Sequence, residues 1–387
     1  MFTRTLVIMP LDHPLKWTAD YQLQTIIQLV EHNNTVLAYH AYEKQSKMYN
    51  FWRKKQDEEK WLGLVHFFPF HPLPFERFTA IYSFNVRLSF LLSLLKVRIL
   101  FRPKGKIILW IFHPRFFWMV GIAKKVFGRR VVVLYDNLDY FSFPSLEEEK
   151  RIRAGEHFLL QNADLVTTIS HSLLQVHRQT RKKIFVVPSG FRQKEFAKIR
   201  TFRTHFHSSA IIGFSGAINY RIDFDLVYEF CKRNPQFLFV FLGPISTDAS
   251  DRNLLKAKIK KLFLLPNVTH IEYEKPAEIP KIMQNWDIGI IPYDLKIQFN
   301  QYCNPLKVME YFYLGLPVLS TPIPELLQYQ KYIHFGSSVT EWESAVHQIL
   351  KKGLNKKNQQ ETRQIAIKNS WKNKIEQIAQ HLSDNLY

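Results

Sequence analysis

Lysine, glutamate and asparagine side chains gather at the start of one helical pattern in the last third of the chain. Asn304 and Lys307 open the segment NPLKVMEYFYLG, and Glu310 follows Lys307 by one helical turn. A helix N-terminus attracts phosphate through its N–H groups and its dipole, and a lysine adds a full positive charge. A carboxylate one turn later can accept hydrogen bonds from ribose hydroxyls. With Tyr293 at the end of the preceding apolar run IIPY, this spacing predicts a nucleoside diphosphate site.

The alternative is a Lys–Glu pair on a solvated helix. The remaining positions of the helix argue against it, because they are apolar: Val308, Met309, Tyr311, Phe312 and Leu314. Such a helix is expected to be mostly buried, and charged side chains on a buried helix are seldom idle. We therefore interpret Lys307 and Glu310 as functional.

Glycines end two other apolar runs, IIGFSG and FLFVFLG. Gly216 and Gly243 let the backbone approach a ligand closely, although either is equally consistent with an ordinary turn. The helix expected after Gly216 would present further N–H groups to a phosphate. We interpret Asp223 and Asp225 as a helix cap and a first-turn acid rather than a metal-binding pair.

Two aspartates follow the β-branched run RVVVLY. Asp136 and Asp139 are expected at the carboxyl end of a buried strand, where a carboxylate can deprotonate a hydroxyl group as a general base. The alternative is that they cap the next helix or hold a loop. His13, Ser170 and Ser189 are placed on the acceptor side of the same site. A structural histidine, a helix N-cap at Ser170 and a tight turn at Ser189 are the alternatives.

Apolar runs alternate with helical patterns along the whole chain, which predicts βαβ units and parallel sheets. The expected strands are 5–9, 35–40, 106–112, 130–136, 164–170, 183–190, 210–216, 237–243, 267–273, 287–293 and 317–321. The pattern restarts at residue 210, so we predict two Rossmann-like, doubly wound α/β domains. Ligands of such folds bind outside the carboxyl ends of the strands, in a cleft that both sheets would face.

The expected domains are 1–195 and 205–364, joined by a polar linker at 192–209. The end of the chain, 356–387, reads as one long polar helical pattern, and its part from about 365 is expected to pack back on the N-terminal domain.

The formal net charge is +20, which indicates a polyanionic partner. From residue 77 to residue 135 there are twelve Lys or Arg and no Asp or Glu, and apolar residues interleave with these cations. The stretch 84–106 is typical of an interfacial amphipathic helix at an anionic membrane. A core helix with a basic rim is the alternative. No recognised nucleic-acid motif accompanies the charge, so we expect no nucleic-acid partner.

Cys231 and Cys303 suggest neither a disulfide framework nor a metal site. No secretory signal is seen at the start of the chain, and no uncharged apolar run reaches the length of a membrane span. No Ser/His/Asp set, Walker loop or HExxH motif is present. We expect a cytoplasmic protein, peripheral at the inner membrane face, without a metal or a cofactor.

Taken together, five segments resemble GT-B glycosyltransferases of the glycogen synthase and sucrose synthase group. ADLVTTIS with VVPSG resembles the close of their N-terminal domain, and IIGFSGAINYRIDFDL resembles the opening of their C-terminal domain. WDIGIIPY with NPLKVMEYFYLGLPVLST resembles a later run of that domain, and NSW resembles their last helix. VLYDNLDYF is similar to a segment of bacterial relatives that build teichuronic acid and exopolysaccharides.

The resemblance spans nearly the whole chain and implies transfer of a sugar from a UDP- or GDP-sugar to a glycan or lipid-linked acceptor. It implies that Lys307 contacts the donor phosphates, that Glu310 contacts the ribose, and that Asp136 or Asp139 lies beside the acceptor hydroxyl. The donor side would comprise Gly216, Arg221, Gly243, Tyr293, Asn304, Lys307 and Glu310. The fold usually needs no metal.

The chain departs from the pattern at several positions. Tyr302 stands where retaining members carry a second glutamate, and LDHPLKW lacks their glycine-rich loop. Pro-Ser-Gly replaces Pro-Asn-Gly, and Asp139-Tyr140 replaces Asp-Asp. These departures favour a second hypothesis, a non-catalytic protein of the same fold that binds a nucleotide sugar or a membrane surface.

Overall fold

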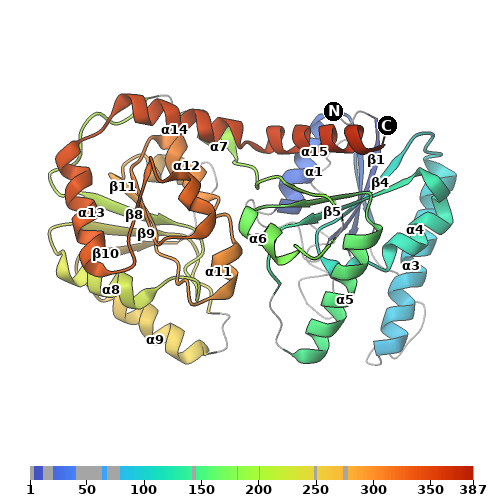
Figure 1. Cartoon of the computed structure of the whole chain (residues 1–387), viewed down its shortest axis with the longest axis horizontal. Helices are drawn as coiled ribbons and strands as arrows, with labels where there is room; N and C mark the ends of the chain where they lie inside the picture. The colour runs from blue at the N-terminus through green and yellow to red at the C-terminus, as the bar shows by residue number, and fades with distance from the viewer. Residues whose placement is uncertain are drawn as a thin grey trace. The chain divides into compact units, whose positions relative to one another are not determined.

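The structure is a computed structural model that describes residues 4–11, 21–40, 63–67, 79–141, 145–180, 182–199, 201–247, 251–272 and 278–386. It divides into two compact units. The first comprises Met1–Ile169, Leu174–Val187 and Lys374–Tyr387, and the second comprises Ser170–Leu173 and Pro188–Asn373. Each unit is a parallel sheet flanked by helices (Figure 1). The predicted pair of Rossmann-like α/β domains is confirmed.

The first unit is built on a seven-stranded sheet in the order β3-β2-β1-β4-β5-β6-β7. Its strands are β1 Leu6–Leu11, β2 Thr35–His40, β3 Leu64–Phe67, β4 Ile107–Ile111, β5 Val131–Asn137, β6 Leu165–Thr168 and β7 Ile184–Val186. Its helices are α1 Tyr21–Glu31, α3 Thr79–Leu100, η1 Pro114–Phe116, α4 Met119–Phe127, η2 Gly128–Arg130 and α5 Leu146–Asn162. Strands β4 and β5 are continuous buried runs because helices cover both faces of a parallel sheet.

The second unit has a six-stranded parallel sheet in the order β10-β9-β8-β11-β12-β13. Its strands are β8 Ile211–Ser215, β9 Leu238–Leu242, β10 Val268–Ile271, β11 Ile288–Ile291, β12 Val318–Ser320 and β13 Ile333–Phe335. Its helices are α7 Gln193–Phe196, α8 Phe224–Arg233, α9 Arg252–Phe263, α10 Ile279–Met283, α11 Gln298–Tyr302, α12 Lys307–Leu314, η3 Pro324–Tyr329, α13 Val339–Lys352 and α14 Lys356–Lys368. Two helices, α6 His171–Val176 and α15 Trp371–Leu386, have residues in both units.

Several elements differ from the sequence prediction. Strands β3 and β13 and helix α9 were not predicted. The two strands lie at the edges of their sheets, where most of their residues are only half-buried and give a weaker apolar pattern. The single helix expected at 356–387 is two helices, α14 and α15, which break at Asn369–Ser370. The break serves backbone pairing, because the Phe191 N–H donates to the Asn369 carbonyl at 2.6 Å and the Trp371 N–H donates to the Phe191 carbonyl at 3.2 Å.

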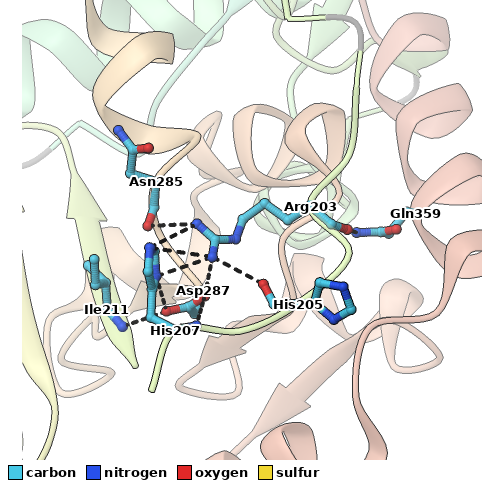
Figure 2. Close-up of polar contacts among 7 residues, drawn as sticks. All are labelled: Arg203, His205, His207, Ile211, Asn285, Asp287 and Gln359. Atoms are coloured by element: carbon cyan, nitrogen blue, oxygen red, sulfur yellow. Dashed lines mark hydrogen bonds and ion pairs between the residues drawn. The ribbon is translucent and has the colours of Figure 1, made fainter. Parts of the chain in front are cut away.

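The predicted linker 192–209 lies within the second unit and is partly packed. Phe196 is fully buried in the core of that unit, and Arg203 and His207 join a polar cluster around buried Asp287 (Figure 2). The Asp287 carboxylate accepts the N–H of Ile211 at 2.8 Å and lies 3.2 Å from Arg203 Nη2. Asp287 precedes β11 and Ile211 begins β8, so this cluster joins two strands at their amino ends, opposite the edge where ligands bind.

A buried ion pair fastens α15 to the sheet of the first unit. Lys374 Nζ lies 3.2 Å from Asp136 Oδ2, and both side chains are almost completely buried. The other Asp136 oxygen accepts a hydrogen bond of 2.8 Å from the Thr167 hydroxyl. The pair therefore joins β5, β6 and the C-terminal helix through one carboxylate.

We expect Lys374→Met to destabilise the protein by about 3–5 kcal/mol, because it leaves the Asp136 carboxylate buried without a counter-charge. Denaturant unfolding of the first unit measures this loss. The double variant Asp136→Asn/Lys374→Met removes both charges and should recover most of the stability. A single variant as stable as the native protein would show that the pair contributes nothing.

Candidate functional site

Two glycines form the edge of the second sheet where β8 and β9 end. Gly216 and Gly243 have φ angles of 126° and 141°, a region that favours glycine. A Cβ atom on Gly243 would lie 2.3 Å from the Gly216 carbonyl oxygen, so a side chain there would require the backbone to move. The Gly216 N–H donates to the Leu242 carbonyl at 2.9 Å. The ends of β8 and β9 therefore contact each other through backbone atoms, with no side chain between them.

Lys307 extends from the first residue of α12 to this bare edge. A Cβ atom on Gly216 would lie 3.5 Å from Lys307 Nζ, and that ammonium donates to the Tyr293 hydroxyl at 2.5 Å. Tyr311, one turn later on α12, fixes the depth of the helix: its hydroxyl donates to the Ile290 carbonyl and accepts the Ser215 N–H. The structure thus brings Lys307 beside Gly216 and Tyr293, two of the residues that the resemblance assigned to the donor side.

The first turn of α12 differs from the prediction in one respect. The N–H groups of Val308 and Met309 donate to the carbonyls of Pro305 and Leu306, at 3.2 and 3.0 Å. These short-range bonds tighten the helix start and occupy two of the groups expected to face a phosphate. The attraction for an anion at this edge therefore rests mainly on the Lys307 charge and the helix dipole.

Tyr293 is buried beside two cations. Burial by itself raises the pKa of its hydroxyl, but Lys307 and then Arg221 outweigh burial and hold the pKa below its ordinary value. The Arg221 guanidinium lies 4.3 Å from the Tyr293 ring centroid and 4.5 Å from that of Phe299. The site is therefore electropositive, and its cations are held by aromatic faces.

Asn300 positions Arg221 and was missed by the sequence reasoning. Its side-chain oxygen accepts from Arg221 Nε at 2.8 Å, and its amide group donates to the carbonyls of Arg221 and Asp294. The segment QFNQY reads as a polar loop, and no sequence signal marks its asparagine as fully buried. Asn304 lies half-buried just before α12.

Glu310 is held by an arginine from the predicted linker. Arg192 Nη2 lies 3.4 Å from Glu310 Oε1, and Arg192 Nη1 lies 2.8 Å from Glu195 Oε2. Burial raises the pKa of Glu195, with Arg192 opposing and Glu310 adding to the shift. Arg192 is separated from Glu310 by 118 residues, so no local pattern could have identified the pair.

The two candidate bases of the first unit differ sharply in their surroundings. Asp136, at the end of β5, has no exposed surface and is ion-paired with Lys374. Asp139 lies three residues further on, half-buried in the loop that follows β5. A general base must reach the proton it removes, and among these two aspartates the geometry therefore favours Asp139.

The acceptor-side candidates are less closely grouped. Ser170 is placed in the second unit, where its hydroxyl donates to the Tyr302 carbonyl at 2.7 Å and accepts the Leu173 N–H as a helix cap. The Ser189 hydroxyl is buried and has no hydrogen-bond partner among the described residues. His13 lies outside the described residues.

Asp223 is confirmed as a helix cap, because its side chain accepts the Leu226 N–H at 3.0 Å. Asp225, in the first turn of α8, pairs with Lys258 at 2.6 Å. Within the described ranges, no three His, Cys, Asp or Glu side chains gather so that they could hold a metal ion.

Comparison with known proteins matches this second unit to one family. Residues 195–372 match the family described as glycosyl transferases group 1. A curated relative is the proposed teichuronic acid biosynthesis glycosyltransferase TuaH of Bacillus subtilis (strain 168), 26% identical over 272 residues. The match covers 64% of this chain and 66% of that relative, just under two thirds of its length.

Solved structures share the fold of the whole chain. Sucrose-phosphate synthase from Thermosynechococcus elongatus has a TM-score of 0.69 at 16% identity, over 98% of this chain and 99% of that chain. Anabaena HepE, crystallised in complex with UDP, has a TM-score of 0.67 at 13% identity, over 98% of this chain and 100% of its own. These likenesses show that the two units have the GT-B architecture.

Proposed function

Because residues 195–372 match the family described as glycosyl transferases group 1, we propose that the protein transfers a hexose from a nucleoside-diphosphate donor to a glycan or lipid-linked acceptor. The donor is a UDP- or GDP-sugar, and UDP bound to Anabaena HepE, a protein of the same fold, supports this choice. The similarity to a teichuronic acid glycosyltransferase supports a cell-surface polysaccharide as the product. We place the protein in the cytoplasm, peripheral at the inner face of the membrane.

The proximity of Lys307 to Gly216 carries the proposal. The glycine backbone at the ends of β8 and β9 allows a pyrophosphate to approach closely, and the ammonium group lies beside it. The Arg221 guanidinium stacks against the same Tyr293 ring that Lys307 contacts, so the cations converge on one edge of the sheet. In this arrangement the carboxylate of Glu310, held by Arg192, contacts the nucleotide ribose.

The reaction breaks the bond between the anomeric carbon and the terminal phosphate oxygen, whose electron pair stays on the nucleoside diphosphate. Lys307 stabilises the charge that grows on that oxygen, an interaction strongest in the transition state. The acceptor hydroxyl oxygen bonds to the anomeric carbon, and its proton passes to Asp139. Because Lys307 supplies the compensating charge, we expect transfer to continue in the presence of EDTA.

The departures at Tyr302 and LDHPLKW keep the non-catalytic binding protein as a second candidate. The two candidates agree on donor binding and differ on turnover. An acceptor-dependent release of nucleoside diphosphate distinguishes them, because a binding protein releases none.

The test is thermal unfolding of the full chain with UDP-, GDP-, dTDP- and ADP-sugars. At 100 times its dissociation constant, a ligand of the folded state stabilises by about 2.7 kcal/mol. We expect a rise in Tm with the UDP- or the GDP-sugars and none with the other nucleotides. No rise with any nucleotide sugar would overturn both the transferase and the binding-protein proposals.

A further inference from the structure

Helix α3 exposes an apolar stripe on the surface of the first unit. Its exposed residues at helical spacing include Phe84, Leu92, Leu95 and Ile99, with Leu88 half-buried on the same face. Ile99 is 67% exposed and Phe84 is 52% exposed. A monomeric soluble protein seldom exposes several large apolar side chains in one stripe, so this face is suited to a partner.

The opposite face of α3 is buried, and it carries small polar as well as apolar residues. Asn85, Ser89 and Ser93 lie there with Val86, Phe90, Leu94 and Val97. The Tyr39 hydroxyl donates to the Val86 carbonyl at 3.1 Å, and Phe90 packs edge-on against Tyr39 and Trp118. These contacts hold α3 against the sheet and beside α4 (Figure 1).

Cations border the apolar stripe. Lys96 and Arg98 flank Leu95 and Ile99, and Arg87 lies more than two turns earlier over the Trp118 ring. The loop after α3, the end of α4 and η2 add exposed cations: Arg102, Lys104, Lys106, Lys124, Lys125 and Arg129. Residues 77–135 contain no Asp or Glu, so no carboxylate within this stretch offsets the charge. Apolar side chains flanked by cations are complementary to the interface of an anionic bilayer.

The packing of α3 decides how such a bilayer is engaged. Within the described part of the chain, the helix at Ala80–Leu100 is long and apolar enough to cross a membrane by length and composition. About a third of its apolar window is nevertheless buried against the unit, and the Tyr39, Phe90 and Trp118 contacts hold it there. A helix attached along one face can insert only its other face, so it lies in the plane of the interface.

We propose that α3 is the membrane-docking surface of this protein: its apolar stripe enters the headgroup region of an anionic bilayer, and the surrounding cations contact lipid phosphates. A second copy of the chain fits less well, because two such basic surfaces repel each other. The inference rests on the proposed function only for its location at the membrane. Vesicle binding tests the surface, and donor binding tests the function.

A cysteine introduced on α3 offers a direct probe of insertion. Cys231 and Cys303 are both buried, so Ile99→Cys provides an exposed thiol for an environment-sensitive fluorophore. We expect a blue shift when the labelled full chain meets mixed phosphatidylcholine–phosphatidylglycerol vesicles, and none with phosphatidylcholine alone. The matched control is Leu264→Cys, which is 73% exposed beyond the end of basic helix α9. Equal shifts at the two positions would overturn the proposal.

Vesicle co-sedimentation measures the contribution of each part of the surface. Leu95→Gln/Ile99→Gln should weaken binding at least about tenfold, because apolar burial drives insertion. Lys96→Gln/Lys104→Gln should weaken it about fivefold, or 1 kcal/mol, for each cation removed. The control Leu254→Gln/Leu264→Gln replaces two exposed leucines of the second unit and should leave vesicle binding unchanged.

Three results would contradict the proposed surface. The first is that the native chain does not bind anionic vesicles. The second is that the control variant Leu254→Gln/Leu264→Gln weakens vesicle binding as much as Leu95→Gln/Ile99→Gln does. The third is that the native chain sediments as a dimer and that Leu95→Gln/Ile99→Gln dissociates this dimer. Folding and donor binding are checked by the Tm of each variant with and without nucleotide sugar. A chain that binds vesicles but no nucleotide sugar would overturn the proposed function and leave this inference standing.

Discussion

Lys307→Ala is expected to lower the turnover number at least about 100-fold, a loss of about 2.7 kcal/mol in transition-state stabilisation. The lysine lies beside the glycine edge of the second sheet and donates to the Tyr293 hydroxyl. Charge on the departing phosphate oxygen is greatest in the transition state, so kcat should fall by a larger factor than KM rises.

Initial rates of nucleoside diphosphate release, measured over a range of donor concentrations, give both constants for this variant. Lys281→Ala is the matched control, since this lysine is 53% exposed on α10, pairs with Glu278, and precedes the amino end of β11. A Lys307→Ala enzyme within threefold of native turnover would remove this lysine from the catalytic assignment. The same loss in Lys281→Ala would indicate a general effect of removing positive charge.

Asp139→Asn is expected to reduce turnover about 100- to 10,000-fold, the range over which general bases act. The amide keeps the shape of the side chain and cannot take the acceptor proton. Donor binding should be retained, because the residues proposed to bind the donor belong to the second unit. Stability should change by less than about 1 kcal/mol at this half-buried loop position.

Asp136→Asn is the informative comparison, because it lies three residues away and is buried against Lys374. We expect it to lower the denaturant midpoint of the first unit, with a smaller effect on the turnover of the folded fraction. If Asp136→Asn abolishes turnover in a folded protein and Asp139→Asn does not, the role of base passes from Asp139 to Asp136.

Local patterns in the sequence were sufficient for the fold class and for the neighbourhood of Lys307 and Tyr293. Buried parallel strands read as apolar runs, so β5 was predicted within one residue at each end, and the helices between the strands follow a period of 3.6 residues. Lys307 and Tyr293 come together because Tyr293 closely follows strand β11, Lys307 begins helix α12, and a short stretch of chain joins the two elements.

Contacts between distant residues could not be predicted in this way. The pairs Arg192–Glu310 and Asp136–Lys374 depend on which elements become neighbours in space, and 118 residues separate the first pair. Asn300 shows the same limit, because its burial under Arg221 follows from how α11 packs rather than from the polar segment that contains it.

Helix α3 shows where the sequence alone reaches its limit. The sequence by itself determined a long basic and apolar helix at this place, two parallel α/β domains, and a lysine in the first turn of a largely apolar helix, because each follows from spacing along the chain. Only the tertiary structure decided that the buried face of α3 includes Asn85, Ser89 and Ser93 and that the apolar residues Leu92, Leu95 and Ile99 are exposed. It also decided that Asp136 is fully buried while Asp139 is only half-buried. The physical reason is that α3 carries apolar residues on both its buried and its exposed faces. The elements available for packing, rather than the local sequence pattern, therefore select the face that is buried.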